Sequence, residues 1–433
     1  MYYSRTIKLC SAAAIAALPV TGYAQVATKI IGEGDAISYT TSGGTVNTTV
    51  DVIRFAGDAN QVGGFVVQLD TEDDASHIYG TLDGGTPFNV IRTAGAINTL
   101  TQTQFDGEIG LADDGTVGYV ATFDDGLITG IKGVFLDDTV VARADQPNTP
   151  DNFLDLRLTN AGTVSYLTDV TREGLFAGNP PVQTSLAPGD DVTLAGSNTL
   201  TIDNIENRQH GFSETGGNII VADVDTGAST NDDLVLLNNA PVASGAGNIK
   251  EGDDATPNGG VGNWDNFDFV DINSDGNWIL TGDTAGDSNQ DEFLAFNGQV
   301  VVKQGDTISE GDVGAAIEAA VLNEDNDWAA TWDIVQNGVS SEAILFGTGS
   351  DLPSVLIQVG DLVEVDGNLV ALTSLNSGLV LTDRRADGSF DIYFQGRVGT
   401  SDDIQFQLTI PEPTSAALLG LATLAVACRR RRA

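Results

Sequence analysis

The chain has 433 residues, of which 61 are acidic and 19 are basic, giving a net charge of −42. Between residues 25 and 410 the imbalance is greater, with 60 acids against 13 bases and a net charge of −47. Such a charge repels nucleic acid and anionic lipid, so nucleic acid is not expected as a partner. Both cysteines, Cys10 and Cys428, lie outside residues 25–410, which excludes a disulfide, a zinc thiolate site and a cysteine nucleophile there.

The N-terminus has the pattern of an export signal. Two basic residues precede an apolar stretch rich in alanine, and small residues follow it up to Ala24. We expect a signal peptide with a signal helix at residues 1–24, cleaved between Ala24 and Gln25. The alternative is an N-terminal helix buried in the fold. It is disfavoured because Pro19 would end that helix early.

Residues 25–410 contain enough apolar material for a core. The hydrophobic fraction of the chain is 41%, and valine, isoleucine, leucine and phenylalanine recur in short alternating runs. The 51 glycines of the chain fall between these runs, which is typical of short strands joined by tight turns. One order recurs: strand, Asn-Gly or Asp-Gly turn, strand, loop, strand, turn, strand.

Seven candidate units of this kind follow one another along the chain. They begin near Val52, Ile109, Leu156, Ile202, Phe267, Ala320 and Leu369. The fifth and sixth units are the most alike, and they place Trp278 and Trp328 at the same position. Residues 30–37 resemble the last strand of a unit, such as residues 301–308.

A repeat of about 40 to 50 residues with four strands is the signature of a propeller blade. We therefore expect residues 25–410 to form an all-β body, a β-propeller of about seven four-stranded blades. The strand at residues 30–37 would complete the last blade and close the ring. A β-sandwich array is the alternative architecture. A parallel β-helix is disfavoured because its repeats are usually about 20 residues long.

Candidate chemistry in the body is sparse. His77 and His210 lie in dissimilar contexts, no Gly-x-Ser-x-Gly motif accompanies them, and both are expected on the surface or in turns. Adjacent carboxylates could act as acid and base on a glycosidic bond, but the acidic composition alone produces such pairs. The pairs are Asp73-Asp74, Asp113-Asp114 and Asp190-Asp191. We assign no catalytic residue, and the protein is not expected to be an enzyme.

One turn has the spacing of an oxygen-ligand loop. Asp271, Asn273 and Asp275 offer side-chain oxygens at alternate positions before Gly276, as at the start of a calcium-binding loop. The later ligands are missing, since Ile279 stands at the ninth position. Asn and Asp also favour hairpin turns and cap their own backbone. A Ca²⁺ site and a plain turn are therefore both open at this position.

The chain ends with Pro411, Glu412 and Pro413, an apolar run at residues 416–428, and four arginines. The arginines are Arg429, Arg430, Arg431 and Arg432. This order resembles the PEP-CTERM sorting signal of Gram-negative envelope proteins, which also carries the name ice-binding protein C-terminal domain. Ice binding itself is not expected, because the body has only isolated Thr-x-Thr runs.

The resemblance implies a sorting route. Residues 411–433 would anchor a precursor in the inner membrane through a hydrophobic transmembrane helix, with the arginines on the cytoplasmic side. An exosortase-like transpeptidase would then cut near the motif and pass the body to the cell surface or the extracellular matrix. The tandem repeats of the body also resemble those of Asn-x-x-Gly repeat proteins of the envelope.

These features predict an exported, non-enzymatic surface or matrix protein whose body is an interaction or structural module. Its expected ligands are extracellular polysaccharide, another envelope protein or calcium. The alternative is a polysaccharide-binding lectin or a polysaccharide-acting enzyme with a site at the propeller axis. In that alternative Trp264 and Trp332 would line a sugar platform, while Trp278 and Trp328 would belong to the core.

Overall fold

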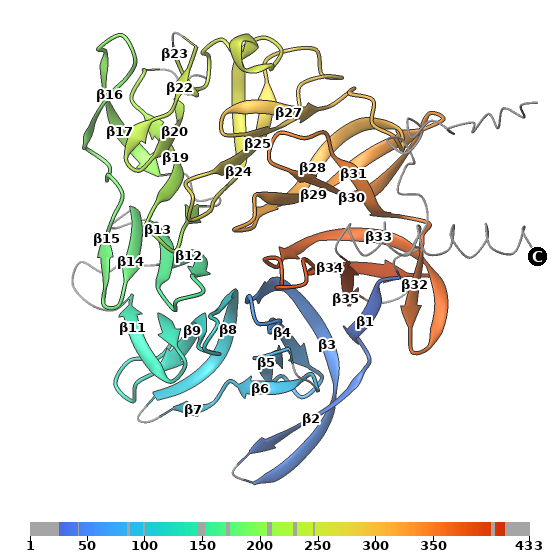
Figure 1. Ribbon diagram of the computed structural model, residues 1–433. Coiled ribbons are helices and arrows are strands. Elements are labelled where there is room, and N and C mark those ends of the chain that lie inside the picture. Colours follow the sequence, from blue (N-terminus) through green and yellow to red (C-terminus); the bar gives the residue numbers. More distant parts are fainter. Residues whose placement is uncertain are drawn as a thin grey trace, which may run out of the picture.

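The computed structural model describes residues 26–41, 43–84, 87–97, 100–144, 152–169, 174–205, 210–227, 232–245, 247–399 and 403–411. Within them the chain is all-β, and its strands form a ring of seven blades, each built on four antiparallel strands (Figure 1). The predicted β-propeller is confirmed. The expected terminal helices and the signal cleavage site lie outside the described residues, as do Glu412, Pro413 and the four arginines. Among the described residues, no helix has the length and apolar character needed to cross a membrane.

The first four blades follow the chain order, with the inner strand named first. Blade 1 comprises β3 (Gly44–Ala59), β4 (Phe65–Thr71), β5 (Ser76–Thr81) and β6 (Asn89–Thr93). Blade 2 comprises β8 (Leu100–Leu111), β9 (Val117–Asp124), β10 (Ile131–Leu136) and β11 (Thr139–Arg143). Blade 3 comprises β12 (Asn152–Leu158), β13 (Val164–Asp169), β14 (Gly174–Gly178) and β15 (Pro181–Gln183). Blade 4 comprises β17 (Thr199–Ile205), β19 (Asn218–Val224), β20 (Asp233–Leu237) and β21 (Ala240–Pro241).

The last three blades have the same plan. Blade 5 comprises β24 (Trp264–Ile272), β25 (Trp278–Thr284), β26 (Phe293–Phe296) and β27 (Gln299–Lys303). Blade 6 comprises β28 (Asp312–Leu322), β29 (Asp327–Gln336), β30 (Val339–Thr348) and β31 (Ser354–Gln358). Blade 7 comprises β33 (Asn368–Leu381), β34 (Phe390–Val398), β35 (Asp403–Ile410) and β1 (Thr28–Gly32).

Short strands extend several inner strands into hairpins. They are β2 (Ala36–Thr41) beside β3, β7 (Ala96–Ile97) beside β8, β16 (Asp191–Thr193) beside β17, and β32 (Leu362–Val365) beside β33. In blade 4, β18 (Gly211–Phe212) continues the inner position beside β19, while β22 (Ala243–Ser244) and β23 (Gly247–Asn248) form a separate hairpin before the 3₁₀ turn η1 (Thr256–Asn258).

The ring is closed by strands from the two ends of the chain. β1 pairs antiparallel with β35, with Thr28 opposite Gln407 and Gly32 opposite Ile404. β1 therefore takes the outer position that the fourth strand occupies in the other blades. The predicted completion of the last blade by the N-terminal strand is confirmed, but that strand ends at Gly32, and residues 36–37 belong to β2.

The repeating unit proposed from the sequence matches the blades. Trp278 on β25 pairs with Ile272, and Trp328 on β29 pairs with Leu322, so both tryptophans begin a second strand at the same register. The Asp-Gly turn between β24 and β25 places Gly276 at a φ of 79°, a backbone conformation that glycine adopts without steric cost. Alternating apolar residues therefore determine the strands of each blade, and turn residues determine where the strands end.

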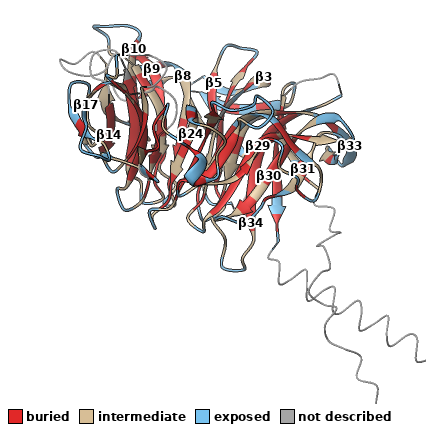
Figure 2. Cartoon of the chain, turned by 90° about the horizontal axis from the view of Figure 1, so that it is seen from above, coloured by how far each residue is buried: buried red, intermediate tan, exposed pale blue. Residues whose placement is uncertain are grey.

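Each interface between neighbouring blades has its own apolar cluster. Between blades 6 and 7, for example, Ile344 and Ile357 pack with Phe390 and Phe394. Figure 2 shows buried residues along the strands and exposed residues in the connecting loops. Fully burying one such side chain contributes about 1.5–3 kcal/mol, so the faces between blades supply most of the core.

The two ends of the ring differ. One end, here called the turn end, carries the turns that join each inner strand to the second strand of its blade. Across the axis at this end, the amide Nδ2 of Asn160 in blade 3 is 3.2 Å from Oδ2 of Asp383 in blade 7. The last residue of β35, Ile410, pairs with Phe390 at the start of β34. The chain therefore leaves the ring at the turn end.

Candidate functional sites at the axis and on blade 1

Charged side chains of the inner strands meet at the axis. Arg157 on β12 interacts electrostatically with four carboxylates from blades 1, 2, 3 and 5, and its Nε is 3.4 Å from Oδ1 of Asp155. The other three carboxylates are those of Asp58 on β3, Glu108 on β8 and Asp271 on β24. The side chains of Arg157 and Asp155 are 31% and 13% exposed. One guanidinium thus lies among four acids.

Burial controls the protonation of these acids. It raises the pKa of Asp58 to about 7 and the pKa of Glu108 to about 7, because it disfavours the charged form. It also raises the pKa of Asp271. Burial acts on Asp155 in the same direction, but the neighbouring charge of Arg157 contributes to a pKa that is lowered overall. The axis therefore places Asp155, whose pKa is lowered, beside two acids that titrate near neutral pH.

Each axial carboxylate also joins two blades. It accepts a hydrogen bond from a backbone N–H in the inner strand of the next blade, or just before that strand. The pairs are Asp58 with Leu111 at 2.8 Å, Glu108 with Leu156 at 3.4 Å, Asp155 with His210 at 2.6 Å, and Asp271 with Leu322 at 3.0 Å. These acids are thus occupied by contacts within the fold.

A Ser-His-Asp hydrogen-bond chain lies between blades 3 and 4. Nε2 of His210 is 2.8 Å from Oγ of Ser165, and Nδ1 is 2.9 Å from Oδ2 of Asp155. This order is that of a serine hydrolase triad, but Ser165 and His210 are both 0% exposed. The expectation of a surface or turn position for His210 is wrong. No sequence motif signals the contact, because Ser165 and His210 are 45 residues apart and meet only where two blades pack.

His77 is also buried, so the expectation of a surface or turn position is wrong for it too. It lies on β5, where Nε2 is 3.1 Å from Oγ1 of Thr71 and Nδ1 is 2.9 Å from Oγ1 of Thr93. The ring of Tyr39 packs against it at a centroid distance of 4.5 Å. Hydroxyl groups satisfy both ring nitrogens, which allows the imidazole to be buried, and burial lowers its pKa.

The four tryptophans belong to the core. Trp278 and Trp328 are 4% and 0% exposed, as predicted from their shared position. Trp264 and Trp332 are each 1% exposed, so the expected sugar platform at these two residues is wrong. Their indole N–H groups have internal acceptors, the Oγ of Ser244 and the carbonyl oxygen of Gly314. The acids of the axis are therefore not accompanied by these aromatic rings, which the alternative of a sugar site placed there.

The turn considered for calcium uses its oxygens within the protein. The Oδ1 of Asn273 accepts the N–H of Asn277 at 3.0 Å, while Asp271 faces the axial group and accepts the N–H of Leu322. Asp275 is exposed. Asn273 therefore caps its own turn, as the plain-turn alternative expected. Calcium binding by Asp271, Asn273 and Asp275 stays a prediction.

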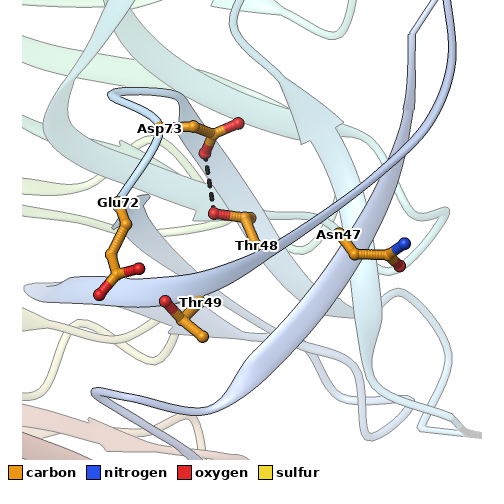
Figure 3. Close-up of a pocket in the computed structure, with 5 residues that line it drawn as sticks. All are labelled: Asn47, Thr48, Thr49, Glu72 and Asp73. Atoms are coloured by element: carbon orange, nitrogen blue, oxygen red, sulfur yellow. Dashed lines mark hydrogen bonds between the residues drawn. The ribbon is translucent and has the colours of Figure 1, made fainter.

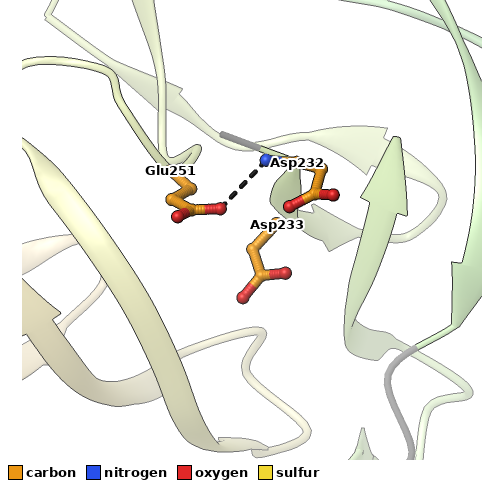
Figure 4. A group of neighbouring side chains, drawn as sticks. All are labelled: Asp232, Asp233 and Glu251. Atoms are coloured by element: carbon orange, nitrogen blue, oxygen red, sulfur yellow. Dashed lines mark hydrogen bonds between the residues drawn. The ribbon is translucent and has the colours of Figure 1, made fainter. Parts of the chain in front are cut away.

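A different acidic group brings three carboxylates close together. Carboxylate oxygens of Asp232, Asp233 and Glu251 in blade 4 lie within 4.8 Å of one another (Figure 4). The backbone N–H of Asp232 donates to Oε2 of Glu251 at 2.9 Å, and burial raises the pKa of Glu251. Hard cations such as Ca²⁺ prefer oxygen ligands of this type. Sequence reasoning missed this group because Glu251 is distant from the Asp pair along the chain.

An open cleft lies on blade 1 where the β2–β3 hairpin meets the turn between β4 and β5. It has a volume of about 490 Å³ and is lined by Asn47, Thr48, Thr49, Glu72 and Asp73 (Figure 3). We call it the hairpin cleft. All five side chains are polar, and Glu72 is tied to the hairpin because its N–H donates to the carbonyl oxygen of Thr49 at 3.1 Å.

The carboxylate of Asp73 is held rigidly at the edge of the hairpin cleft. It accepts hydrogen bonds from the hydroxyls of Thr71 at 2.6 Å, Tyr39 at 2.6 Å and Thr48 at 3.1 Å. These bonds, led by the one from Thr71, lower the pKa of Asp73. A second cleft of about 420 Å³ lies between β2 and β6. No motif in the sequence marks either cleft.

Residues 409–432 match the PEP-CTERM protein-sorting motif. The predicted resemblance of the C-terminus is thereby confirmed, and the motif implies recognition by an exosortase-like sorting enzyme. The motif implies export, a membrane-anchored precursor and then the cell surface. No curated protein sequence matches the chain.

Several solved structures are distantly similar. Raptor from Chaetomium thermophilum shares 9% identity over 89% of this chain and 30% of that chain, with a TM-score of 0.41. A protein of unknown function from Dyadobacter fermentans shares 10% identity over 89% and 98%, with a TM-score of 0.37. PorZ, a surface component of the type-IX secretion system of Porphyromonas gingivalis, shares 13% identity over 88% and 49%, with a TM-score of 0.33. Similarity this weak carries no argument about function.

Proposed function

We propose that this chain, which ends in a PEP-CTERM protein-sorting motif, is a non-enzymatic interaction module of the cell surface or extracellular matrix. One observation carries the proposal. The motif begins at Thr409, near the end of β35, and the ring is already closed by β1 pairing with β35 up to Gln407. A cut just beyond the last strand would release a body whose blades are all complete.

The contacts of candidate catalytic groups favour a binding role over an enzymatic one. The hydroxyl of Ser165 is buried beside His210, and a nucleophile must be within reach of its substrate. The axial carboxylates of Asp58 and Asp271 accept backbone N–H groups from neighbouring blades. Both sets of residues that resemble catalytic machinery therefore hold blades together.

Sorting is tested by a variant in which Pro411, Glu412 and Pro413 are all replaced by alanine. In a host with an exosortase, the unaltered chain should appear at the surface with its mass reduced by the tail. The triple variant should stay in the inner-membrane fraction at the mass of the uncut precursor. Fractionation followed by mass spectrometry gives both readings. Surface delivery of the triple variant would overturn the sorting part of the proposal.

The non-enzymatic role is tested by the variant Ser165→Ala. We expect no hydrolysis of chromogenic esters or aryl glycosides by the unaltered chain beyond that of a mock preparation. Ser165→Ala should therefore change only the stability of the protein, because it removes one buried hydrogen bond worth about 1 kcal/mol. Hydrolysis that Ser165→Ala abolishes would establish an enzyme and contradict the proposal.

A further inference from the structure

We infer that the hairpin cleft of blade 1 is a binding site for a neutral, hydroxyl-rich polysaccharide. The inference rests on the proposed function and names the class of ligand that the module would take. The hairpin that forms the cleft differs in charge from the rest of the body. Residues 36–50, which form most of the hairpin, contain no charged side chain, although the body has 60 acids.

The chemistry of the cleft fits sugar hydroxyls. Asn47 supplies an amide that both donates and accepts hydrogen bonds, and the hydroxyl of Thr48, which donates its proton to Asp73, can still accept one. Glu72 adds a carboxylate, and hydrogen bonds to ionised groups are stronger than neutral ones. The Oγ1 of Thr49 is shielded from solvent and has no hydrogen-bond partner among the described residues, whereas buried polar groups are normally paired. A ligand hydroxyl could pair it after rotation of the threonine side chain.

Charge decides between neutral and anionic polysaccharides. Glu72 and Asp73 both line the cleft, and its five described lining residues include no basic side chain. A uronate or sulfate group entering the cleft would meet two like charges at short range, which is unfavourable. A neutral chain avoids this repulsion and the repulsion from the rest of the acidic body.

The hydrogen bonds of Asp73 argue against a cation as the main ligand. Its Oδ1 accepts from Thr48 and Thr71, and its Oδ2 accepts from Tyr39. Both oxygens are already used, so they have little capacity left to coordinate a metal. The same bonds fix the carboxylate in place, which lowers the entropy cost of ordering it on binding.

The position of the cleft suits a protein held by its C-terminus. Thr49 lies at the start of the part of β3 that pairs with β4, and Glu72 follows the end of β4. Both lie at the end of blade 1 opposite the β3–β4 turn. The chain leaves the ring at the turn end, after Ile410. The hairpin cleft would thus face away from the membrane in an anchored precursor.

Calorimetric titration of the full chain in detergent tests the inference. The probes are cellohexaose, maltohexaose and dextran as neutral ligands, polygalacturonate as an anionic one, and calcium chloride. We expect binding of at least one neutral probe and none of polygalacturonate. Thr49→Val and Asn47→Ala should each weaken neutral binding about tenfold, the loss that corresponds to one well-placed hydrogen bond.

Two further variants separate the site from general effects. Thr101→Val changes an exposed threonine on β8 of blade 2 and should leave binding unchanged. Glu72→Gln keeps an acceptor but removes one of the two charges, so neutral binding should persist, and polygalacturonate should still not bind because Asp73 and the acidic body remain. If the unaltered chain binds calcium and Glu72→Gln abolishes that binding, the ligand of the cleft is a cation and the inference is overturned.

The inference would also be overturned if no neutral probe binds. The same holds if Thr101→Val weakens binding as much as Thr49→Val and Asn47→Ala do. Melting temperatures of all variants show whether a loss of binding comes from unfolding. The proposed sorting is read separately from the surface fraction, so either idea can fail while the other holds.

Discussion

Arg157 lies where four blades contribute an acid to the axis. Taking charges out of water is costly, and an incomplete set of partners leaves that cost uncompensated. The guanidinium offsets part of the repulsion among the carboxylates, in the way that a bound cation would. Arg157 is therefore a structural residue whose contribution depends on the ionisation of its neighbours.

Replacing Arg157 with methionine should destabilise the protein. We expect a loss of about 2–4 kcal/mol in the free energy of unfolding at pH 8, because the acids then repel one another without a counter-charge. The loss should be smaller at pH 5, where Asp58 and Glu108 are protonated. Urea denaturation measures both values. Arg54→Met is the matched control, since Arg54 is 45% exposed beside Asp70 and should change stability little.

The acids themselves predict a pH dependence. The pKa of Asp58 rises from 3.8 to about 7 and that of Glu108 from 4.5 to about 7, so the folded state binds more protons than the unfolded state between these values. Stability from these groups is fully present below about pH 4 and falls as the pH rises towards 7. From pH 5 to pH 8 the loss should be roughly 2 kcal/mol per group.

The double variant Asp58→Asn and Glu108→Gln tests this pH dependence. It keeps acceptors for the N–H groups of Leu111 and Leu156 but cannot ionise. Its unfolding free energy should fall less between pH 5 and pH 8 than that of the unaltered chain. Parallel curves for the two proteins would show that the axial acids do not titrate in this range.

At the scale of strands and blades, the features that depend on neighbouring residues, the strands and the turns, can be predicted from the sequence. Alternation marks the strands, and Asp-Gly turns such as the one at Gly276 mark where each strand ends. Residues 30–37 could be recognised as the end of a last strand and the turn after it because they repeat the ending of another unit. Contacts between blades follow no such rule. Ser165 meets His210, and Trp264 is buried, only because of how neighbouring sheets pack.

The hairpin cleft shows the same limit. Its lining comes from β3 and from the β4–β5 turn, which are brought together by sheet pairing. Hydroxyl and amide residues such as Thr48 and Asn47 are common in turns, so their presence alone does not indicate a site. The only sequence feature that sets the hairpin apart is the absence of charged residues at positions 36–50. This feature is noticeable only by comparison with the 60 acids of the body.

β1 should matter far more than its length indicates. A chain that begins after Gly32 would lack the strand that pairs with β35, and both blade 7 and the ring would be left open. We expect a large fall in melting temperature and aggregation through the free edge of β35. A chain that ends at Pro411 is the control, since β35 ends at Ile410, and its melting temperature should be unchanged. Equal melting temperatures for the two truncated chains would contradict the role assigned to β1.

For the whole molecule, net charge governs the response to salt. With 60 acids and 13 bases in the body, self-repulsion destabilises the compact state, and screening should raise the melting temperature. If screening acts alone, magnesium and calcium chloride at equal ionic strength should raise the melting temperature equally. Calorimetry measures the melting temperatures.

A rise with calcium alone would show that screening does not act alone and would indicate a specific site. Glu251→Gln would then test the group formed with Asp232 and Asp233, while Asp275→Asn would test the turn that contains Asn273. The variant that abolishes the difference between the two ions identifies the site.

The pairing of Thr28 with Gln407 has a consequence for how the chain acquires its structure. Blades 1 to 6 are each built from consecutive stretches of sequence, so their strands can associate early and locally. Blade 7 can form only when both ends of the body are available, and we expect a contact between residues so far apart in sequence to form late. During translocation from the N-terminus, β1 would emerge first and remain without its partner until β35 has crossed. The ring can therefore close only after the whole body has passed through the membrane. A chain whose translocation stops early would keep β1 unpaired.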